Sequence, residues 1–470
     1  MVTQAFFVAN RTPGLLGFPL KSKAIRNARV ALSRPRRERN SMLTQEQNRL
    51  VTRTGPGTPG GALMRRYWHP IALAEELAAG APMPIKILGE ELVLFRDERG
   101  RLGLLGLYCS HRCADLSYGR IEDGGLRCLY HGWLYDVSGR CLEQPAEPPE
   151  SRYRDEIRHL AYPLIERGGL IFAFLGDGEP PLLPSYEFLG ATPEHRFLQR
   201  TFMECNYLQA LEGDLDPAHL SYLHRSLRRG PPGRKEARTV PGSRRASASF
   251  LNADRQPRLA SERTDFGVRN YAVRAAGDGN IHLRINNFIL PNKVANVGVE
   301  GRVGAGCTVH WRVPVDDESH MRFDIFFNRA GPIARERYEK EFAEEVVDHR
   351  HRRNKRNRYL QDRELMRTTN FTGMGNCYAA HDAFAAESPG PIHDRSREHL
   401  GASDACIVAA RRRLLSAIAA VQAGRDPPHV IRDAAQDDMS DIVVVSEVIP
   451  ANADPKDLWK ARRQKPQAVE

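Results

Sequence analysis

Two short pairs of Cys and His residues in this 470-residue chain have the types and spacing of metal ligands. Cys109 and His111 are followed, after sixteen intervening residues, by Cys128 and His131. Two thiolates can bind one iron of a [2Fe-2S] cluster while two neutral imidazoles bind the other iron, and this replacement of thiolate by imidazole raises the reduction potential. A cluster of this kind passes single electrons to an acceptor.

The competing interpretation is a structural zinc site, because two Cys and two His also suit tetrahedral zinc. Zinc-finger ligands usually come as a pair of Cys followed by a pair of His, whereas each segment here supplies one of each. Glycines near the ligands, such as Gly132, also suit a backbone that comes close to a cluster. The pattern therefore favours the iron-sulfur cluster.

A second group of candidate ligands follows Asp216. His219 and His224 lie five residues apart in a helical segment that Gly213 and Pro217 are expected to distort. Two His and one carboxylate form a site that binds non-haem Fe(II) and leaves positions open for oxygen and substrate. The spacing alone does not identify the carboxylate.

These segments resemble the Rieske non-haem iron ring-hydroxylating oxygenases, and most closely the large (α) subunits of the phthalate dioxygenase type. The likeness rests on GRIEDGGLRCLYHGWLYDVSGRCLEQPAEP from Gly119, NYLQALEGDLDPAHLSYLHRS from Asn206 and HDAFAAESPGPIHDR from His381. It covers residues 42–424, which is most of the chain.

The resemblance implies a ligand set for each metal. Cys109 and Cys128 would bind the buried iron of the cluster. His111 and His131 would bind the outer iron. The mononuclear iron would be held by His219, His224 and Asp382. Glu387 and Asp394 are the next candidates if Asp382 is not the carboxylate.

The resemblance also implies a homotrimer, or a dimer of trimers, in which each cluster serves the iron of the neighbouring subunit. Asp216 would then bridge His219 of one subunit to His131 of the next, a catalytic role without metal ligation. From the residues alone, Asp216 could instead cap a helix that begins at Pro217.

Two residues depart from the family pattern. Cys113 stands where the family commonly has Gly, and we expect a small buried side chain that is not a ligand. His381 stands where the family commonly has Gln. It could perturb protonation near the iron or face solvent, and we favour solvent, because adjacent residues on a regular element point in different directions.

The length and patterning predict a two-domain α+β protein. Short apolar runs from Pro84 to Phe174 predict an all-β domain, and a second antiparallel sheet is expected between about Phe250 and Phe327, with a helix over 404–424. The predicted units are a basic disordered extension (1–41) and a Rieske domain with its amino-terminal flank (42–184). A catalytic iron domain (185–425) and a tail (426–470) follow.

The net charge of +11 lies mostly in residues 1–41, which hold nine Lys or Arg and one Glu. This segment has the composition of a transit peptide, but a disordered extension or a mis-assigned start is the preferred interpretation.

A second basic run at 349–358 could dock an acidic electron-transfer partner, and it lacks the interleaved aromatic residues of a nucleic-acid site. No apolar run is long enough to span a membrane, and eight cysteines are too few for a disulfide scaffold, so a cytoplasmic location is expected.

The resemblance implies the oxygenase component of a multicomponent system that inserts oxygen from O2 into an aromatic substrate. Electrons would come from NAD(P)H through a separate flavin and iron-sulfur reductase, because this chain has no Gly-rich dinucleotide motif. A carboxylate substrate would need an Arg in the pocket, for which Arg245 and Arg284 are candidates. The alternatives are a monooxygenase that removes O-methyl groups or hydroxylates, and an electron-transfer protein that lacks one of the mononuclear ligands.

Overall fold

The amino-terminal β region consists of short strands in three small antiparallel sheets. The computed structural model describes residues 42–77, 80–227, 250–297 and 306–462. The sheets have the orders β1-β10-β9, β2-β3-β4 and β5-β6-β7-β8. Their strands are β1 (Trp68–Leu73), β2 (Met83–Ile87), β3 (Glu90–Arg96), β4 (Leu102–Gly106), β5 (Arg120–Glu122), β6 (Gly125–Arg127), β7 (Leu134–Asp136), β8 (Cys141–Glu143), β9 (Leu164–Arg167) and β10 (Leu170–Phe174).

Tight turns keep the β5–β8 sheet small and position two loops at its edge. Asp123 and Gly124 join β5 to β6 with φ of 54° and 78°, which is the left-handed pair that an Asp-Gly hairpin turn adopts. One loop follows β4 and the other joins β6 to β7. These two loops carry the four Cys and His residues that the sequence singles out.

A ten-stranded sheet forms the second part of the molecule. Its order is β12-β13-β14-β15-β16-β17-β11-β19-β18, with β20 paired to β14. The strands are β11 (Arg196–Met203), β12 (Arg258–Arg263), β13 (Gly267–Gly277), β14 (Asn280–Ile289), β15 (Lys293–Val297), β16 (Gly306–Pro314), β17 (His320–Asn328), β18 (Val346–Val347), β19 (Arg350–His351) and β20 (Val445–Pro450).

The two faces of this sheet have different partners. One face turns Trp311 toward Phe172 of β10, with ring centroids 5.4 Å apart, so it packs against the amino-terminal β region. The opposite face, which we call the helix side, carries alternate residues such as Arg284, His310, Arg312 and Arg322. Arg312 on this side forms ion pairs at 2.9 Å with Asp214 at the end of α5.

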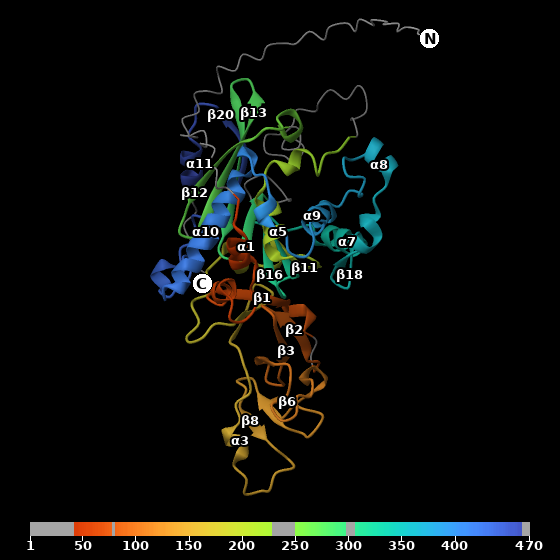
Figure 1. The fold of residues 1–470 in the computed structure, drawn as a ribbon, viewed down its shortest axis with the longest axis vertical. Helices are drawn as coiled ribbons and strands as arrows, with labels where there is room; N and C mark the ends of the chain where they lie inside the picture. Colours follow the sequence, from red (N-terminus) through yellow and green to blue (C-terminus); the bar gives the residue numbers. More distant parts are fainter. Residues whose placement is uncertain (1–41, 78–79, 228–249, 298–305, 463–470) are drawn as a thin grey trace, which may run out of the picture.

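Helices cover the helix side, where α5 contacts β15 and β16 and α10 contacts β12 and β13 (Figure 1). The amino-terminal helices α1 and α2 contact α10 and not the β5–β8 sheet. The helices are α1 (Gln45–Thr52), α2 (Pro59–Met64), α3 (Tyr153–Glu156), α4 (Glu187–Gly190), α5 (Tyr207–Leu215), α7 (Arg335–Glu345), α8 (Arg363–Thr368), α9 (Tyr378–Glu387), α10 (Ala405–Gln422) and α11 (Pro455–Arg462).

The predicted α+β fold class, the small-stranded first region and the helix over 404–424 are confirmed. Residues 1–41 and Arg245, which sequence reasoning singled out, lie outside the described residues. Among the described residues, no helix combines the length and the apolar character needed to cross a membrane.

Candidate metal centres

The first candidate centre lies on the two loops at the edge of the β5–β8 sheet. Cys109 and Cys128 are 2% and 3% exposed, whereas His111 is exposed and His131 half-buried. The two imidazole rings lie 4.4 Å apart between centroids. Buried thiols beneath accessible imidazoles fit a cluster with one inner and one outer iron.

Neighbouring side chains fix the positions of these ligands. Trp133 stacks on His111 with ring centroids 4.5 Å apart and planes at 4°, and the hydroxyl of Tyr135 lies 3.2 Å from the Cys109 sulfur. Gly132 has φ of +76°, a conformation that glycine adopts without strain, and a Cβ there would approach Pro145 to 3.0 Å. These contacts explain the aromatic and glycine residues beside the ligands.

The zinc interpretation requires four ligand atoms that converge on one point. Within the described part of the chain, one group of three or more His, Cys, Asp or Glu side chains has its ligand atoms within 4.8 Å of one another, and it is not this one. The four loop residues are therefore spread too widely for one tetrahedral metal, as a cluster with two irons requires.

The expectation for Cys113 is wrong, because its side chain is exposed and not buried. Its backbone has φ of 56°, and its N–H donates to the carbonyl oxygen of Cys109 at 2.9 Å. This left-handed turn directs the side chain outward at the loop tip. A left-handed backbone also gives a physical reason for Gly at this position in the family.

The second candidate centre is the group that does converge, namely His219, His224 and Asp382. The Nε2 atoms of the two His lie 3.2 Å apart, and the Asp382 Oδ1 lies 3.0 Å from His224 Nε2 and 3.8 Å from His219 Nε2. Ligands about 2.1 Å from a metal and at right angles to one another lie about 3 Å apart. The three atoms thus fit one face of an octahedral non-haem iron, with the opposite face open.

The local sequence explains how two helices deliver these side chains. Helix α5 ends at Leu215 because Pro217 cannot continue it, and the Asp216 Oδ1 accepts the backbone N–H of Ala218 at 2.7 Å. The chain then turns into the 3₁₀ helix η5 (His219–Ser221), which carries the first imidazole. Asp382 comes from the middle of α9.

Electrostatics keep the Asp382 carboxylate ionised. Burial opposes ionisation, but the imidazoles of His224 and His219 and the guanidinium of Arg322 outweigh it and hold the pKa of Asp382 well below its usual range. An ionised carboxylate is the form that binds a metal. Sequence reasoning missed Arg322, because only the strand register places it under this site.

The expectation that His381 faces solvent is wrong. His381 is 1% exposed, and its Nδ1 lies 3.3 Å from the Nδ1 of His224. Its Nε2 lies 3.1 Å from the carbonyl oxygen of Gly375, which can only accept, so Nε2 carries the proton. The Nδ1 of His381 is then an acceptor for the Nδ1–H of His224, and this leaves the Nε2 lone pair of His224 directed at the metal site.

The other carboxylates considered from the sequence are engaged elsewhere. Glu387 accepts hydrogen bonds from the Tyr359 hydroxyl at 2.8 Å and from the Glu204 N–H at 3.1 Å. Asp394 accepts from the N–H and hydroxyl of Ser396. Neither belongs to the converging group.

The position of Asp216 bears on both roles considered for it. It lies at the carboxyl end of α5 and not at a helix start, so it is not the predicted cap. Its Oδ2 lies 3.7 Å from His219 Nδ1, a buried atom that lacks a hydrogen-bond partner in the described chain. Burial raises the pKa of Asp216, but the neighbouring His219 and the Ala218 N–H outweigh it, so the net shift is downward.

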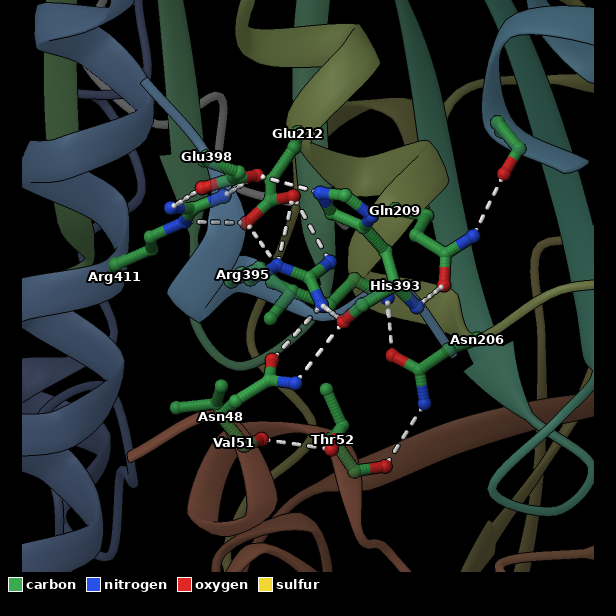
Figure 2. A network of polar contacts seen from close by, with 12 residues as sticks. Asn48, Val51, Thr52, Asn206, Gln209, Glu212, His393, Arg395, Glu398 and Arg411 are labelled. Carbon is green, nitrogen blue, oxygen red and sulfur yellow. Dashed lines mark hydrogen bonds and ion pairs between the residues drawn. The ribbon is translucent and has the colours of Figure 1, made fainter. Parts of the chain in front are cut away.

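A buried polar network anchors α5 to its neighbours, as Figure 2 shows. Glu212 accepts hydrogen bonds from Arg395 at 2.9 to 3.1 Å and from Arg411 of α10 at 2.6 Å. Arg395 is fully buried and also donates to Asn48 of α1 at 3.2 Å. Glu398 also pairs with Arg411 at 2.6 Å, so two carboxylates compensate the two guanidiniums where the helices meet.

Gln209, one turn earlier on α5, connects α5, which leads into the segment with His219, to α9, which carries Asp382. Its Nε2 donates to the carbonyl oxygens of Ala386 at the end of α9 and of Gly390 at 2.7 and 2.9 Å. Its Oε1 accepts the N–H of His393 at 2.9 Å. The spacing between α5 and α9 is thereby fixed by a side chain that has all its polar atoms paired.

The basic run at 349–358 has partners within the chain. Arg350 and Arg356 pair with Glu204 at 3.1 and 2.8 Å, and Arg353 pairs with Glu345 at 2.7 Å. These ion pairs account for part of the charge without a docking partner.

Comparisons with known protein families agree with this geometry. The Rieske [2Fe-2S] domain model matches residues 67–164, and the model described as LigXa C-terminal domain like matches residues 185–467. The first match contains all four loop ligands, and the second contains His219, His224 and Asp382.

Individual relatives cover most of the chain. It is 37% identical to the oxygenase subunit of phthalate 4,5-dioxygenase from Pseudomonas putida, over 82% of this chain and 88% of that protein. It is 34% identical to the oxygenase subunit of 5,5'-dehydrodivanillate O-demethylase from Sphingobium sp., over 84% and 85%. Its fold matches the terminal oxygenase of carbazole 1,9a-dioxygenase from Novosphingobium sp. KA1, with a TM-score of 0.52, 19% identity and coverage of 82% and 96%.

The cofactors of such oxygenases are a Rieske [2Fe-2S] cluster and a mononuclear non-haem iron, which are the two groups that the loop residues and the converging triad suit. The chain therefore belongs to the Rieske non-haem iron oxygenases, as an oxygenase (α) subunit of the phthalate dioxygenase type.

Proposed function

We propose that this oxygenase subunit inserts oxygen from O2 into an aromatic carboxylate. The observation that carries the proposal is the cationic character of the helix side of the sheet beside the candidate iron site. Arg274 is 1% exposed, and its Nη2 donates at 2.7 Å to the carbonyl oxygen of Pro217, between Asp216 and His219. Its Nη1 is buried without a hydrogen-bond partner in the described chain.

Arg284 lies on the next strand of the same face, opposite Ala272. Burial and the neighbouring Arg274 lower the pKa of Arg284 to about 10, so it remains charged at neutral pH despite an environment that disfavours the charge. The buried Arg274 with its unpaired donor, next to the half-buried Arg284, favours a bound anion. A carboxylate meets this need, because its two oxygens accept from guanidinium in a bidentate manner.

We assign the metal ligands as the sequence predicts. Cys109, Cys128, His111 and His131 would hold the cluster, and His219, His224 and Asp382 would hold the iron. The bound iron supplies the activation of O2. The protein's part is to keep Asp382 ionised, to orient His224 through His381 and to hold the substrate at the open face.

We also propose that electrons pass between subunits of a homotrimer. Figure 1 shows the β5–β8 sheet at one end of the molecule, separated from α5 and α9 by the β1–β4 region. Both centres have exposed aromatic side chains around them, such as Tyr130 at 55% beside the cluster loops and Tyr378 at 56% beside His224. Contact between the two surfaces of neighbouring copies would bury both and bring Asp216 to His131.

The electron donor would be a separate NAD(P)H-dependent reductase with flavin and iron-sulfur groups, in the cytoplasm. The relatives named as oxygenase subunits support this division of labour, because such a subunit works with other components.

The test is oxygen uptake by the reconstituted protein with a compatible reductase, NADH and a panel of aromatic acids. The panel includes benzoate, phthalate and methoxybenzoates. We expect uptake that depends on an acid and yields either a dihydrodiol or a demethylated phenol. A demethylated phenol would make the enzyme a monooxygenase acting as an O-demethylase. Uptake that no acid stimulates would contradict the proposal.

A further inference from the structure

A buried histidine lies next to the first candidate cluster site and is not one of its proposed ligands. His159 follows α3 and is 5% exposed. The His159 N–H donates to the carbonyl oxygen of Gly139 at 2.7 Å, and the Gly106 N–H donates to the carbonyl oxygen of Leu160 at 2.9 Å. A Cβ at Gly139 would come within 2.1 Å of the His159 carbonyl oxygen, so this close approach requires glycine. The backbone of His159 is therefore fixed between β4 and the turn that precedes β8.

The contacts of the His159 ring determine where its proton lies. Burial lowers the pKa of His159, so the ring is neutral at pH 7. Its Nε2 lies 2.8 Å from the carbonyl oxygen of Gly106, which can only accept, so Nε2 carries the proton. Nδ1 is then an acceptor, and its partner at 2.7 Å is the hydroxyl of Ser110. Ser110 therefore donates to His159 and is held in place by it.

The His159 ring also packs against the residue that contacts the Cys109 sulfur. The ring centroids of His159 and Tyr135 lie 4.7 Å apart, with planes at 31°. The Tyr135 hydroxyl lies 3.2 Å from the Cys109 Sγ. Burial raises the pKa of Tyr135, so its hydroxyl keeps the proton, whereas a cysteine sulfur bound to iron is a thiolate without one. In the loaded protein the Tyr135 hydroxyl would therefore donate to the Cys109 sulfur.

His159 thus connects both partners of this hydrogen bond. Through Nδ1 it holds Ser110, which is the residue after Cys109 in the loop that follows β4. Through its ring face it holds Tyr135, which belongs to β7. One side chain from a third segment therefore controls how closely the Tyr135 hydroxyl approaches the Cys109 sulfur.

We propose that His159 is a positioning residue that sets the reduction potential of the [2Fe-2S] cluster through the hydrogen bond between Tyr135 and Cys109. The inference rests on the proposed assignment of Cys109 as a cluster ligand. A hydrogen bond to a ligand sulfur stabilises the reduced cluster, which is more negative, more than the oxidised cluster, and so raises the potential. The potential governs both the acceptance of an electron from the donor and its transfer to the mononuclear iron.

The test is a redox titration of the cluster-loaded protein, followed by EPR of the reduced cluster. Tyr135→Phe removes the donated proton, and we expect the equilibrium constant of one-electron reduction to fall about tenfold, which is a potential about 59 mV lower. Ser110→Ala breaks the tie to His159 and keeps both rings, and we expect this constant to fall about three- to fivefold. His159→Phe keeps the ring packing and loses both nitrogens, so it should lower the constant by a similar factor.

The double variant Ser110→Ala/Tyr135→Phe should have the potential of Tyr135→Phe alone, because no hydrogen bond to the Cys109 sulfur remains to be positioned. The control is Ser138→Ala, which removes an exposed hydroxyl that donates to Asp136 in the turn between β7 and β8. This control should leave the potential unchanged. Iron content and the visible spectrum show whether each variant carries the cluster, and if His159→Phe does not, Ser110→Ala decides.

An unchanged potential in Ser110→Ala would overturn the proposal, because His159 would then have a purely structural role. Shifts that add in the double variant would also overturn it, since Ser110 and His159 would act by another route. An unchanged potential in Tyr135→Phe would do the same. Cys109→Ala tests the ligand assignment separately: if it keeps the EPR signal of the cluster, the proposed ligand set fails together with this inference.

Discussion

At the scale of single residues, the function depends on which atoms hold the mononuclear iron. We propose His219, His224 and Asp382 as the ligand set, because their three atoms are the group that converges among the described residues. Asp382 is also the carboxylate whose ionised form the surroundings stabilise.

Asp382→Ala should therefore lose the mononuclear iron and keep the cluster. We expect iron to fall from about three to about two atoms per chain, with an unchanged cluster spectrum and no oxygenation. Metal analysis and EPR of the reduced protein measure both. Asp394→Ala is the control and should keep all the iron, so loss of iron in the control alone would assign the ligand to Asp394.

His381 contacts the candidate ligand His224 and would not contact the iron itself. Its Nδ1 accepts from His224 and fixes the imidazole in the form that can bind a metal. We expect His381→Ala to weaken mononuclear iron binding by about ten- to a hundredfold, as loss of such partners usually does. His381→Gln, whose amide oxygen can accept from His224, should keep most of the affinity. Iron titration of the cluster-loaded apo protein tests this, and equal affinities for wild type and both variants would refute the role.

At the scale of elements, α5 must be held firmly, because it delivers His219 at its broken end. Glu212 is the centre of that support, with Arg395 and Arg411 as partners. Burial raises the pKa of Glu212, but the two arginines outweigh it and leave the pKa lowered. A lowered pKa in the folded state gives stability that is present above the unfolded pKa and is lost as the pH falls through the folded value.

Glu212→Gln should lower the free energy of unfolding by about 3 to 5 kcal/mol, because it leaves the buried Arg395 without a compensating charge and leaves Arg411 with Glu398 as its remaining carboxylate. Urea denaturation at neutral pH measures this. The difference in free energy of unfolding between the variant and wild type should shrink below about pH 4.3, where the Glu212 carboxylate of wild type begins to protonate in the unfolded chain. The control is Glu364→Gln, which breaks an exposed pair with Arg367 and should change stability by less than about 1 kcal/mol. A Glu212 variant as mild as the control would contradict this account.

The elements themselves were largely predictable, since they follow from local patterns. The break in α5 follows from Pro217, and the helix over 404–424 follows from its periodicity and from Gly424 after it. The errors concern side-chain direction. Sequence reasoning placed His381 in solvent and Cys113 inside, because burial depends on the packing of distant segments and on one left-handed φ.

The same limit applies to partners that meet across strands. His310 and Asp324 are fourteen positions apart and touch only through the register of β16 and β17. Arg322 reaches the Asp382 site in the same way. No spacing rule along the chain identifies such pairs. The pairs Cys109 with His111 and Cys128 with His131 can be recognised in the sequence, because the two residues of each pair lie close together along the chain.

At the scale of the whole molecule, the two centres of one chain lie apart, so the route of electrons depends on assembly. In the proposed trimer Asp216 would connect subunits, because its Oδ1 serves the local turn while its Oδ2 faces His219. Asn can make the same turn but cannot bridge two imidazole N–H groups as an anion.

Asp216→Asn should keep the fold, the cluster and the mononuclear iron. Reoxidation of the reduced cluster by O2 with substrate bound should slow by about ten- to a hundredfold. Rapid-mixing absorbance at the cluster bands gives the rate. Reoxidation at the wild-type rate would exclude the bridge, while a loss of iron would assign Asp216 a purely structural role.

The central claim is that electrons held by the cluster drive the insertion of oxygen from O2 into an aromatic acid. The most direct test is a single turnover of the chemically reduced, fully loaded protein with ¹⁸O₂ and the acid that stimulates uptake, followed by mass spectrometry of the product. We expect ¹⁸O in the product, in proportion to the cluster oxidised. Cluster oxidation without a labelled product, or a product whose new oxygen comes from water, would contradict the account.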